Sequence, residues 1–280
     1  MLRNRLLAMP RMVEWAIRVE RTPSLVWLAC VAAALLPTWI WMARRMLDRS
    51  DDPLGLLAIA ALAVLAWQCR NELRASPRLG WLAVGLAAAL ASTLTIALLP
   101  PLLVALLALT ALGAALAAFL PTRVDSAPVL GLSLLSLPWL ASLQFYAGYP
   151  LRALTAEASR WLLAPFFSVE RDGSALRVDG HLVIVDAPCS GVQMLWLAYF
   201  TACVVALATG RRSRSFLARL PAVSICVLAG NVVRNTLLVA LEARGHGASG
   251  PLHEAIGLVV LAIVCGAIAW VMDAREPRHV

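Results

Sequence analysis

Three short motifs in the second half of the chain carry the residues best suited to chemistry. They are "APCSG" at residues 187–191, "GNVVRN" at residues 230–235 and "PLHEAIG" at residues 251–257. Each supplies a different reactive group: a thiol, a guanidinium and an imidazole. Acyl transfer from a peptide bond needs a nucleophile, a group that moves a proton and a group that offsets negative charge in the tetrahedral intermediate. The three motifs could supply these roles, with none duplicated.

Cys189 is the candidate nucleophile of the first motif. It follows Pro188, and proline suits the first helical position, so we predict a helix that begins near Pro188 and holds the sulfur in its first turn. Unpaired N–H groups and the helix dipole favour a thiolate there. Ser190 adjoins the cysteine, and Gly191 leaves room for a peptide backbone. Because small packing residues also occur at helix starts, this motif does not decide the matter alone.

Arg234 is the charged residue of the second motif and stands within an apolar run. Asn231 and Asn235 share its helical face by their spacing. A charge at this depth costs roughly 2.5 to 3.5 kcal/mol on insertion scales, so we expect Arg234 to face the bundle interior or a wet cavity. There it could bind a developing oxyanion or a carboxylate. Alternatively it forms a structural ion pair with Glu242 or Asp186.

His253 follows Pro251 in the third motif, at the predicted start of the last helix. As an imidazole it could accept a proton and later return it. A histidine at such a place could also be an ordinary interfacial residue. Its value lies in the convergence of Cys189, Arg234 and His253, which stand on three successive predicted helices and are expected in the same layer of the membrane.

The composition requires these helices to lie in a membrane. The chain has 280 residues, of which 61% are hydrophobic and 14% are charged, and its mean hydropathy is +0.80. A helix crosses a bilayer with about 20 apolar residues. We therefore predict an all-α, polytopic membrane protein with about eight transmembrane helices, at residues 24–43, 54–68, 79–99, 101–121, 127–148, 188–209, 216–241 and 251–272.

The arginines predict the orientation of these helices. All of the basic side chains are arginines, since the sequence contains no lysine, and most lie in short loops. Cytoplasmic loops of membrane proteins are enriched in basic residues, which favours both termini inside and the three motifs on the extracytoplasmic side of a cytoplasmic (inner) membrane. Arg44 and Arg45 stand against this pattern. We read the basic charge as a signal of topology and expect no binding of nucleic acid.

The whole chain, residues 1–280, is predicted to form a single membrane domain with one long extracytoplasmic insertion. Residues 1–23 are expected to lie on the lipid surface as an amphipathic helix. Residues 149–187 are predicted to hold an interfacial helix, with Leu154, Trp161, Leu162 and Phe166 on its apolar face, followed by a β-hairpin at "RDGS" and "VDGH". The hairpin is either a plain connector or an edge that guides an extended peptide to the site.

Cysteine and histidine spacing predicts no metal site. Among six cysteines there is no CxxC pair and no Cys/His cluster, and the cysteines other than Cys189 mostly fall within apolar runs. We expect these to be packing residues, and we expect neither a metal nor a cofactor.

The three motifs together resemble those of the exosortase/archaeosortase family. That family is similar in having an A-C-S-G motif, an N-x-x-R motif and an H-x-x-x-G motif on three successive helices, which here are "APCSG", "NVVR" (231–234) and "HEAIG" (253–257). The resemblance covers roughly residues 126–272, with 188–272 as the catalytic helices, while the earlier helices resemble the family only in hydropathy. The proline between Ala187 and Cys189 departs from the family pattern.

The resemblance implies a membrane cysteine protease or transpeptidase that forms a thioester with its substrate. Cys189 would be the nucleophile, Arg234 would stabilise the oxyanion or orient the substrate, and His253 would be the acid and base, with Asn231, Ser190 and Gly191 in support. The implied partner is the C-terminal sorting-signal helix of a secreted protein, which would dock against the bundle within the lipid. The acceptor is unknown.

Two other functions fit the same residues. A transporter or an anion- or proton-handling subunit could use Arg234 and His253 to bind an anion or relay protons. A hydrolytic peptidase would differ from a transpeptidase only in that water, not an amine, resolves the thioester.

Overall fold

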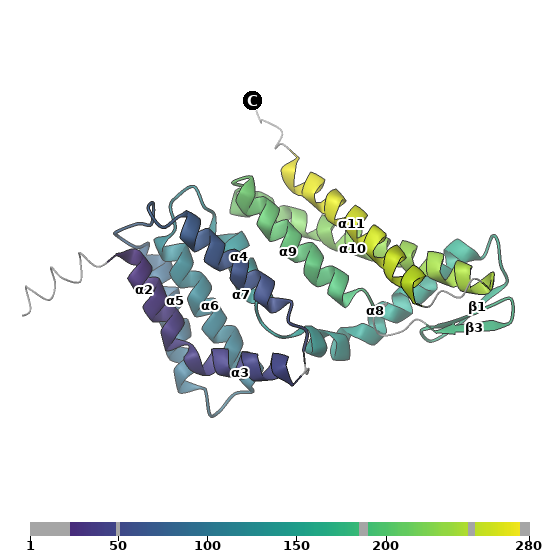
Figure 1. Cartoon of the computed structure of the whole chain (residues 1–280), viewed down its shortest axis with the longest axis horizontal. Coiled ribbons are helices and arrows are strands. Elements are labelled where there is room, and N and C mark those ends of the chain that lie inside the picture. The colour runs from purple at the N-terminus through teal and green to yellow at the C-terminus, as the bar shows by residue number, and fades with distance from the viewer. Residues whose placement is uncertain (1–22, 49–50, 185–189, 246–249, 275–280) are drawn as a thin grey trace, which may run out of the picture.

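The computed structural model describes residues 23–48, 51–184, 190–245 and 250–274. Its helices are α2 (Ser24–Ala34), α3 (Leu36–Leu47), α4 (Gly55–Gln68), α5 (Leu79–Leu94), α6 (Pro101–Phe119), α7 (Ser126–Leu135), α8 (Leu140–Leu163), α9 (Val192–Ala208), α10 (Ser213–Ala243) and α11 (Pro251–Asp273). Three short strands, β1 (Val169–Asp172), β2 (Ala175–Val178) and β3 (His181–Ile184), follow α8. Figure 1 shows the helices side by side, with the small sheet at one end of the bundle. The predicted interfacial helix within residues 1–23 falls almost wholly outside the described residues.

The helices are those of a polytopic membrane protein, but they do not confirm the predicted number of eight spans. Among the described residues, α6, α10 and α11 are long and apolar enough to cross a membrane, and the count reaches five if the bent pairs α2/α3 and α7/α8 are each one span. The helices α4, α5 and α9 are apolar but shorter. Each of the eight predicted segments contains at least part of a helix. The apolar pattern therefore predicted the positions of the helices better than their lengths.

The fifth predicted span, residues 127–148, is wrong as a continuous helix. The chain leaves α7 at Leu135 and enters α8 at Leu140, with a bend of 91° between them. Pro138 explains the break, because proline lacks an N–H donor and disfavours helical geometry in the residue before it. The predicted extracytoplasmic segment of 149–187 therefore begins within α8, which continues through Pro150.

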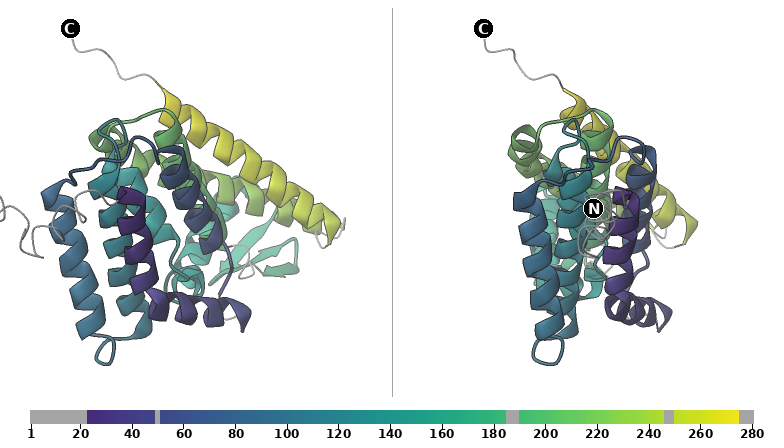
Figure 2. Two further views of the ribbon diagram at one scale, coloured as in Figure 1. Left: turned by 60° about the vertical axis from the view of Figure 1, so that its left-hand side comes forward. Right: turned by 90° about the vertical axis from the view of Figure 1, so that its left-hand side faces the viewer.

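The helix α6 is the centre of the first half of the molecule. Twelve of its 19 residues are buried, and most of these are alanine or glycine. Small side chains let neighbouring helices approach closely, and α6 packs against α2, α3, α5 and α7. Figure 2 shows α5 at one edge of the molecule and α11 at the opposite edge. The helix α9 joins the halves through its contacts with α7, α10 and α11.

The helix α8 runs across the end of the bundle towards the sheet (Figure 1). It packs on α9, α10, β1 and β2, while Leu154, Trp161 and Leu162 on its other side are exposed, as an interfacial helix requires. A second apolar core lies beneath the sheet, formed by Ala156, Leu163, Leu176, Val178, Leu238 and Val239. The sheet is therefore held on α8 and on the end of α10.

The predicted hairpin is a three-stranded antiparallel sheet in the order β1-β2-β3. Gly173, with φ +59°, begins the first turn, and Asp179 (φ +47°) and Gly180 (φ +87°) form the second. Two consecutive positive φ values define the type I′ turn that suits a two-residue hairpin. Asp179 also accepts a hydrogen bond from the Ser168 backbone N–H at 2.9 Å, which ties the second turn to the start of β1.

Candidate functional site

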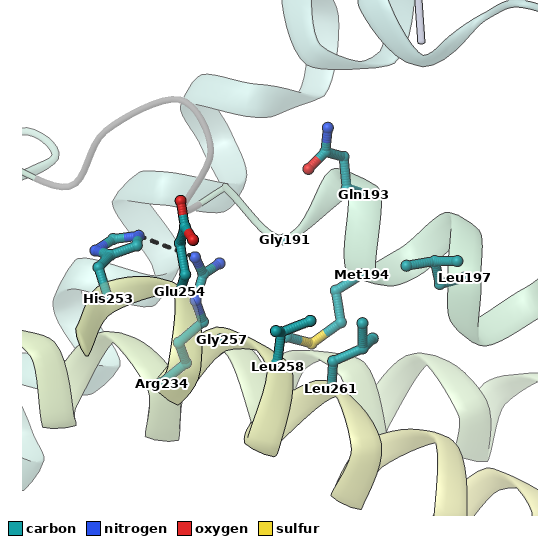
Figure 3. A pocket seen from close by; sticks show the side chains of 10 residues that line it. All are labelled: Gly191, Gln193, Met194, Leu197, Arg234, His253, Glu254, Gly257, Leu258 and Leu261. Atoms are coloured by element: carbon teal, nitrogen blue, oxygen red, sulfur yellow. Dashed lines mark hydrogen bonds between the residues drawn. The ribbon is translucent and has the colours of Figure 1, made fainter. Parts of the chain in front are cut away.

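A cavity of about 490 Å³ opens where the starts of α9 and α11 meet the middle of α10. Its lining comes from Gly191, Gln193, Met194, Leu197, Arg234, His253, Glu254, Gly257, Leu258 and Leu261. Figure 3 shows His253, Glu254 and Arg234 at one end of this cavity and the four larger apolar side chains at the other, with Gln193 on the α9 side above Met194. The volume lies within the usual range for small-molecule and peptide pockets. Residues from all three predicted motifs therefore share one pocket.

Arg234 and His253 meet at the polar end of the pocket. The guanidinium NH2 atom lies 3.1 Å from the Nε2 atom of His253, as the dashed line in Figure 3 marks. Because a guanidinium only donates hydrogen bonds, Nε2 is the acceptor in this contact. The predicted common layer of the two residues is thus correct, and Pro251 stands at the start of α11 as predicted.

Gly257 explains why a glycine follows the histidine by four positions. Residues four apart lie on the same face of a helix, so Gly257 and His253 both face α10. A Cβ atom at Gly257 would lie 3.3 Å from Arg234 Nε and 3.4 Å from its NH2 atom. The histidine bonds the guanidinium while the glycine leaves room for it.

Gly191 and Asn231 form a second close contact between motifs. Gly191 has φ +83°, and a Cβ atom there would lie 3.0 Å from Asn231 Cγ. Asn231 is 2% exposed and donates from Nδ2 to Thr155 Oγ1 at 3.1 Å. Its backbone oxygen accepts from Asn235 Nδ2 at 2.9 Å. Asn231 on α10 therefore contacts both Gly191, which precedes α9, and α8.

Ser190, which also precedes α9, is hydrogen-bonded to α8. Its buried hydroxyl donates to Gln144 Oε1 at 2.7 Å and accepts from the Val192 backbone N–H at 3.3 Å. Gln144 and Thr155, both on α8, were not predicted as site residues. Gln144 had a signal, since it is an amide within an apolar predicted span, whereas nothing in the sequence distinguished Thr155.

The predicted start of the sixth span is wrong by a few residues. The helix α9 begins at Val192, with Gly191 as its N-cap, and not near Pro188. The reason is the left-handed conformation of Gly191, through which an α-helix cannot continue. Cys189 and the alternative ion-pair partner Asp186 lie outside the described residues. The helix α9 therefore begins three residues after Cys189, and the prediction that its first turn holds the sulfur is wrong.

Of the other cysteines, two are buried packing residues, two are half-buried and Cys30 is exposed. Cys69 and Cys203 are buried, and a Cβ atom at Gly131 would lie 2.7 Å from Cys203 Sγ, so the thiol fits against α7. Within the part of the chain that the structure describes, no three side chains of His, Cys, Asp or Glu gather to hold a metal ion.

Apolar helices with a polar pocket at one end of the bundle define a multi-pass membrane protein with a candidate reaction site. The transmembrane exosortase family model matches residues 41–270, and the chain belongs to that family. The match includes α4 to α6, which precede the three motifs and which resembled the family only in hydropathy. Neither a curated protein nor a solved structure matches the chain.

Proposed function

We propose that this chain is a membrane-embedded cysteine transpeptidase that cleaves a C-terminal sorting signal of secreted proteins through a thioester intermediate. The observation that carries the proposal is the contact between Arg234 and His253 at the polar end of the pocket. The family membership and the nearness of Gly191 to the same pocket support it. Cys189 precedes Gly191 by two positions, so a short stretch of chain separates the proposed nucleophile from the pocket lining.

The proposed residues divide the reaction into two acyl transfers. The Cys189 sulfur attacks the carbonyl carbon of the scissile peptide bond, and the carbonyl oxygen becomes an oxyanion that Arg234 stabilises. His253 takes the thiol proton and gives it to the leaving amine as the C–N bond breaks. An amine or water then attacks the thioester and gives a proton to His253, the C–S bond breaks, and His253 returns the proton to the sulfur. The identity of the acceptor decides between transpeptidation and hydrolysis.

The apolar end of the pocket suits the start of the substrate's own helix. Met194 and Leu197 come from α9, and Leu258 and Leu261 come from α11. Both helices run away from the polar end, so apolar side chains follow the polar groups along the path of a peptide. A volume of about 490 Å³ accommodates a few residues and not a whole transmembrane helix. In this proposal the rest of that helix lies in the lipid against the bundle, on the extracytoplasmic side of the inner membrane.

The proposal is tested by replacing Cys189 in cells. The substrate is a secreted protein from the same proteome that ends in a short motif, an apolar helix and an arginine-rich tail. We expect Cys189→Ala to abolish its processing, measured by the mass of the substrate, without loss of the enzyme from the membrane. The matched control is Cys226→Ala, a half-buried cysteine of α10, which should process normally. Unchanged processing by Cys189→Ala would refute the nucleophile.

A further inference from the structure

The loop between α3 and α4 reaches the pocket from the first half of the chain. Asp52 Oδ2 accepts a hydrogen bond from Gln193 Nε2 at 2.7 Å, although the two residues are 141 positions apart. Gln193 lines the pocket that holds Arg234 and His253. The contact joins a segment that carries none of the three motifs to the reaction site.

This contact fixes which way the Gln193 amide points. An ionised carboxylate only accepts hydrogen bonds, so the amide must turn its NH2 group towards Asp52. In Figure 3 the Gln193 nitrogen points away from the pocket, and its oxygen points to the side where Gly191 and the Arg234 guanidinium lie. The pocket therefore receives a hydrogen-bond acceptor whose orientation depends on Asp52.

Asp52 is itself held in place by its neighbour Asp51. The Asp51 side chain is fully buried and lies 3.3 Å from Arg45 Nε. Its Oδ1 atom accepts from the backbone N–H groups of Asp52 at 3.0 Å and of Ala141, at the start of α8, at 3.2 Å. A buried carboxylate with a cationic partner and two N–H donors is a strong constraint, because loss of either kind of partner leaves a buried charge. Asp51 and Asp52 are thereby fixed to α3 and α8.

An extended peptide in the pocket requires both donors and acceptors. Its backbone presents C=O groups, which Arg234 can bind, and N–H groups, which need an acceptor. Among the described side chains of the lining, the strong acceptors belong to Gln193, Glu254 and the ring of His253, and His253 Nε2 already faces Arg234. Gln193 offers an uncharged acceptor, its amide oxygen, whose orientation is set by a second residue, Asp52.

We propose that Asp52 is a positioning residue, which orients Gln193 so that Oε1 accepts a hydrogen bond from a backbone N–H of the substrate beside Arg234 and His253. The inference rests on the proposed function for the peptide nature of the ligand. It makes the loop between α3 and α4 part of the substrate-binding machinery.

Binding of uncleaved peptide tests this inference apart from the chemistry. The full-length Cys189→Ala protein is titrated with a fluorescein-labelled peptide that carries the sorting signal used in the processing assay. Gln193→Met and Asp52→Leu should each raise the Kd about 5- to 20-fold, as loss of one hydrogen bond does, and the double variant should be no worse than either. Asp52→Asn keeps an accepting oxygen and should bind almost as the parent does.

A matched control and a modified peptide separate binding from general stability. Glu72→Leu removes a bidentate pair with Arg123, which also joins two loops but lies away from the pocket, and it should leave the Kd unchanged. A series of peptides is then tested, each methylated at one backbone nitrogen. One of them lacks the N–H that Gln193 is proposed to bind, and the parent and Gln193→Met should bind that peptide equally. Additive effects of the two variants, or no such position, would overturn the inference. Failure of Cys189-dependent cleavage would instead refute the proposed function, and the binding result would still stand.

Discussion

At the residue scale, glycines in two motifs make room for the polar side chains of the site. A Cβ atom at Gly257 would press on the Arg234 guanidinium, and a Cβ atom at Gly191 would press on the Asn231 amide. The sequence pattern predicted roles for Arg234, His253, Asn231, Ser190 and Gly191, and it gave Gly257 a place in a motif but no role. It did not identify Gln144, Thr155 or Gln193, since their roles depend on partners more than 40 positions away.

Replacing Gly257 should impair the reaction more than the fold. In Gly257→Ala the new methyl group would displace Arg234 by a few tenths of an ångström, and small misplacements in a site can cost about 10- to 100-fold in rate. We expect such a loss in the rate of substrate processing, with a normal amount of protein in the membrane. Gly266→Ala is the control on the same helix, because nothing lies within 4 Å of its Cβ position. Equal rates for the two variants would contradict the role of Gly257.

Arg234→Lys tests whether the guanidinium geometry matters. Lysine keeps the charge but lacks the planar fork that can bind His253 and a substrate oxygen together. Processing should fall about 10²- to 10³-fold, as for the loss of an oxyanion donor. Arg244→Lys, at the exposed end of α10 over the Phe167 ring, should process normally. A fully active Arg234→Lys protein would mean that charge alone suffices.

At the element scale, the sheet beside the site is held by an ionic contact with α8. Glu157 on α8 lies 2.6 Å from Arg171 on β1 and 2.6 Å from Arg160 one turn along its own helix. The turn signals at Asp172-Gly173 and Asp179-Gly180 predicted the strands correctly. The docking of the sheet on α8 could not be read from the sequence, because alternating residues specify a strand and not the surface beneath it.

The Glu157 contact should make the sheet sensitive to acid. The hydrogen bond from Arg160, with the charges of Arg160 and Arg171, holds the pKa of Glu157 below its ordinary value. The stabilisation is complete above the ordinary pKa of glutamate and is lost as the pH falls through the lowered one. Glu157→Gln should therefore speed amide hydrogen exchange in β1 at neutral pH, and its protection factors, which correct for the intrinsic pH dependence of exchange, should not fall further as the pH drops below the ordinary pKa of glutamate.

The exposed Glu170 provides the comparison for this exchange measurement. It lies on β1 opposite Arg177 on β2, and none of the ion pairs found among the described residues includes it. Glu170→Gln should leave exchange in the sheet as in the parent, including its acid sensitivity. Similar exchange rates in the two variants would show that the Glu157 carboxylate does not hold the sheet.

Helix boundaries show where apolar patterns lose their predictive power. Continuous hydropathy predicted one span over 127–148, but the helix is broken near Pro138. The sixth span was predicted to start at Pro188, but α9 starts directly after Gly191. In both cases one residue with restricted or unusual backbone geometry sets the helix boundary. Hydropathy averaged over a window of about 20 residues does not detect such a residue. The α11 start was predictable because Pro251 acts at the boundary itself.

At the scale of the whole molecule, hydrogen bonds gather the loops rich in arginine at the end opposite the pocket. Arg123 pairs with Glu72, the Ser213 hydroxyl donates to Asp125 at 2.8 Å, and Arg219 donates to the Val271 carbonyl at the end of α11 at 2.6 Å. Arg45, which opposed the charge rule, lies by contrast against Asp51 near the pocket. Because the charge rule counts arginines whether or not they are paired with a carboxylate, Arg45 still stands against the predicted topology.

This arrangement predicts opposite accessibility for two exposed serines. Ser76 lies between α4 and α5 among the arginine-rich loops, and Ser168 lies directly before β1 beside the pocket end. In a Cys189→Ala background, Ser168→Cys should react with a membrane-impermeant maleimide in intact cells, and Ser76→Cys should react only after the membrane is opened. The unsubstituted background protein gives the signal of the natural cysteines. Labelling of Ser76→Cys in intact cells would invert the topology and place the proposed site on the cytoplasmic side, where a sorting enzyme for secreted proteins could not meet its exported substrate.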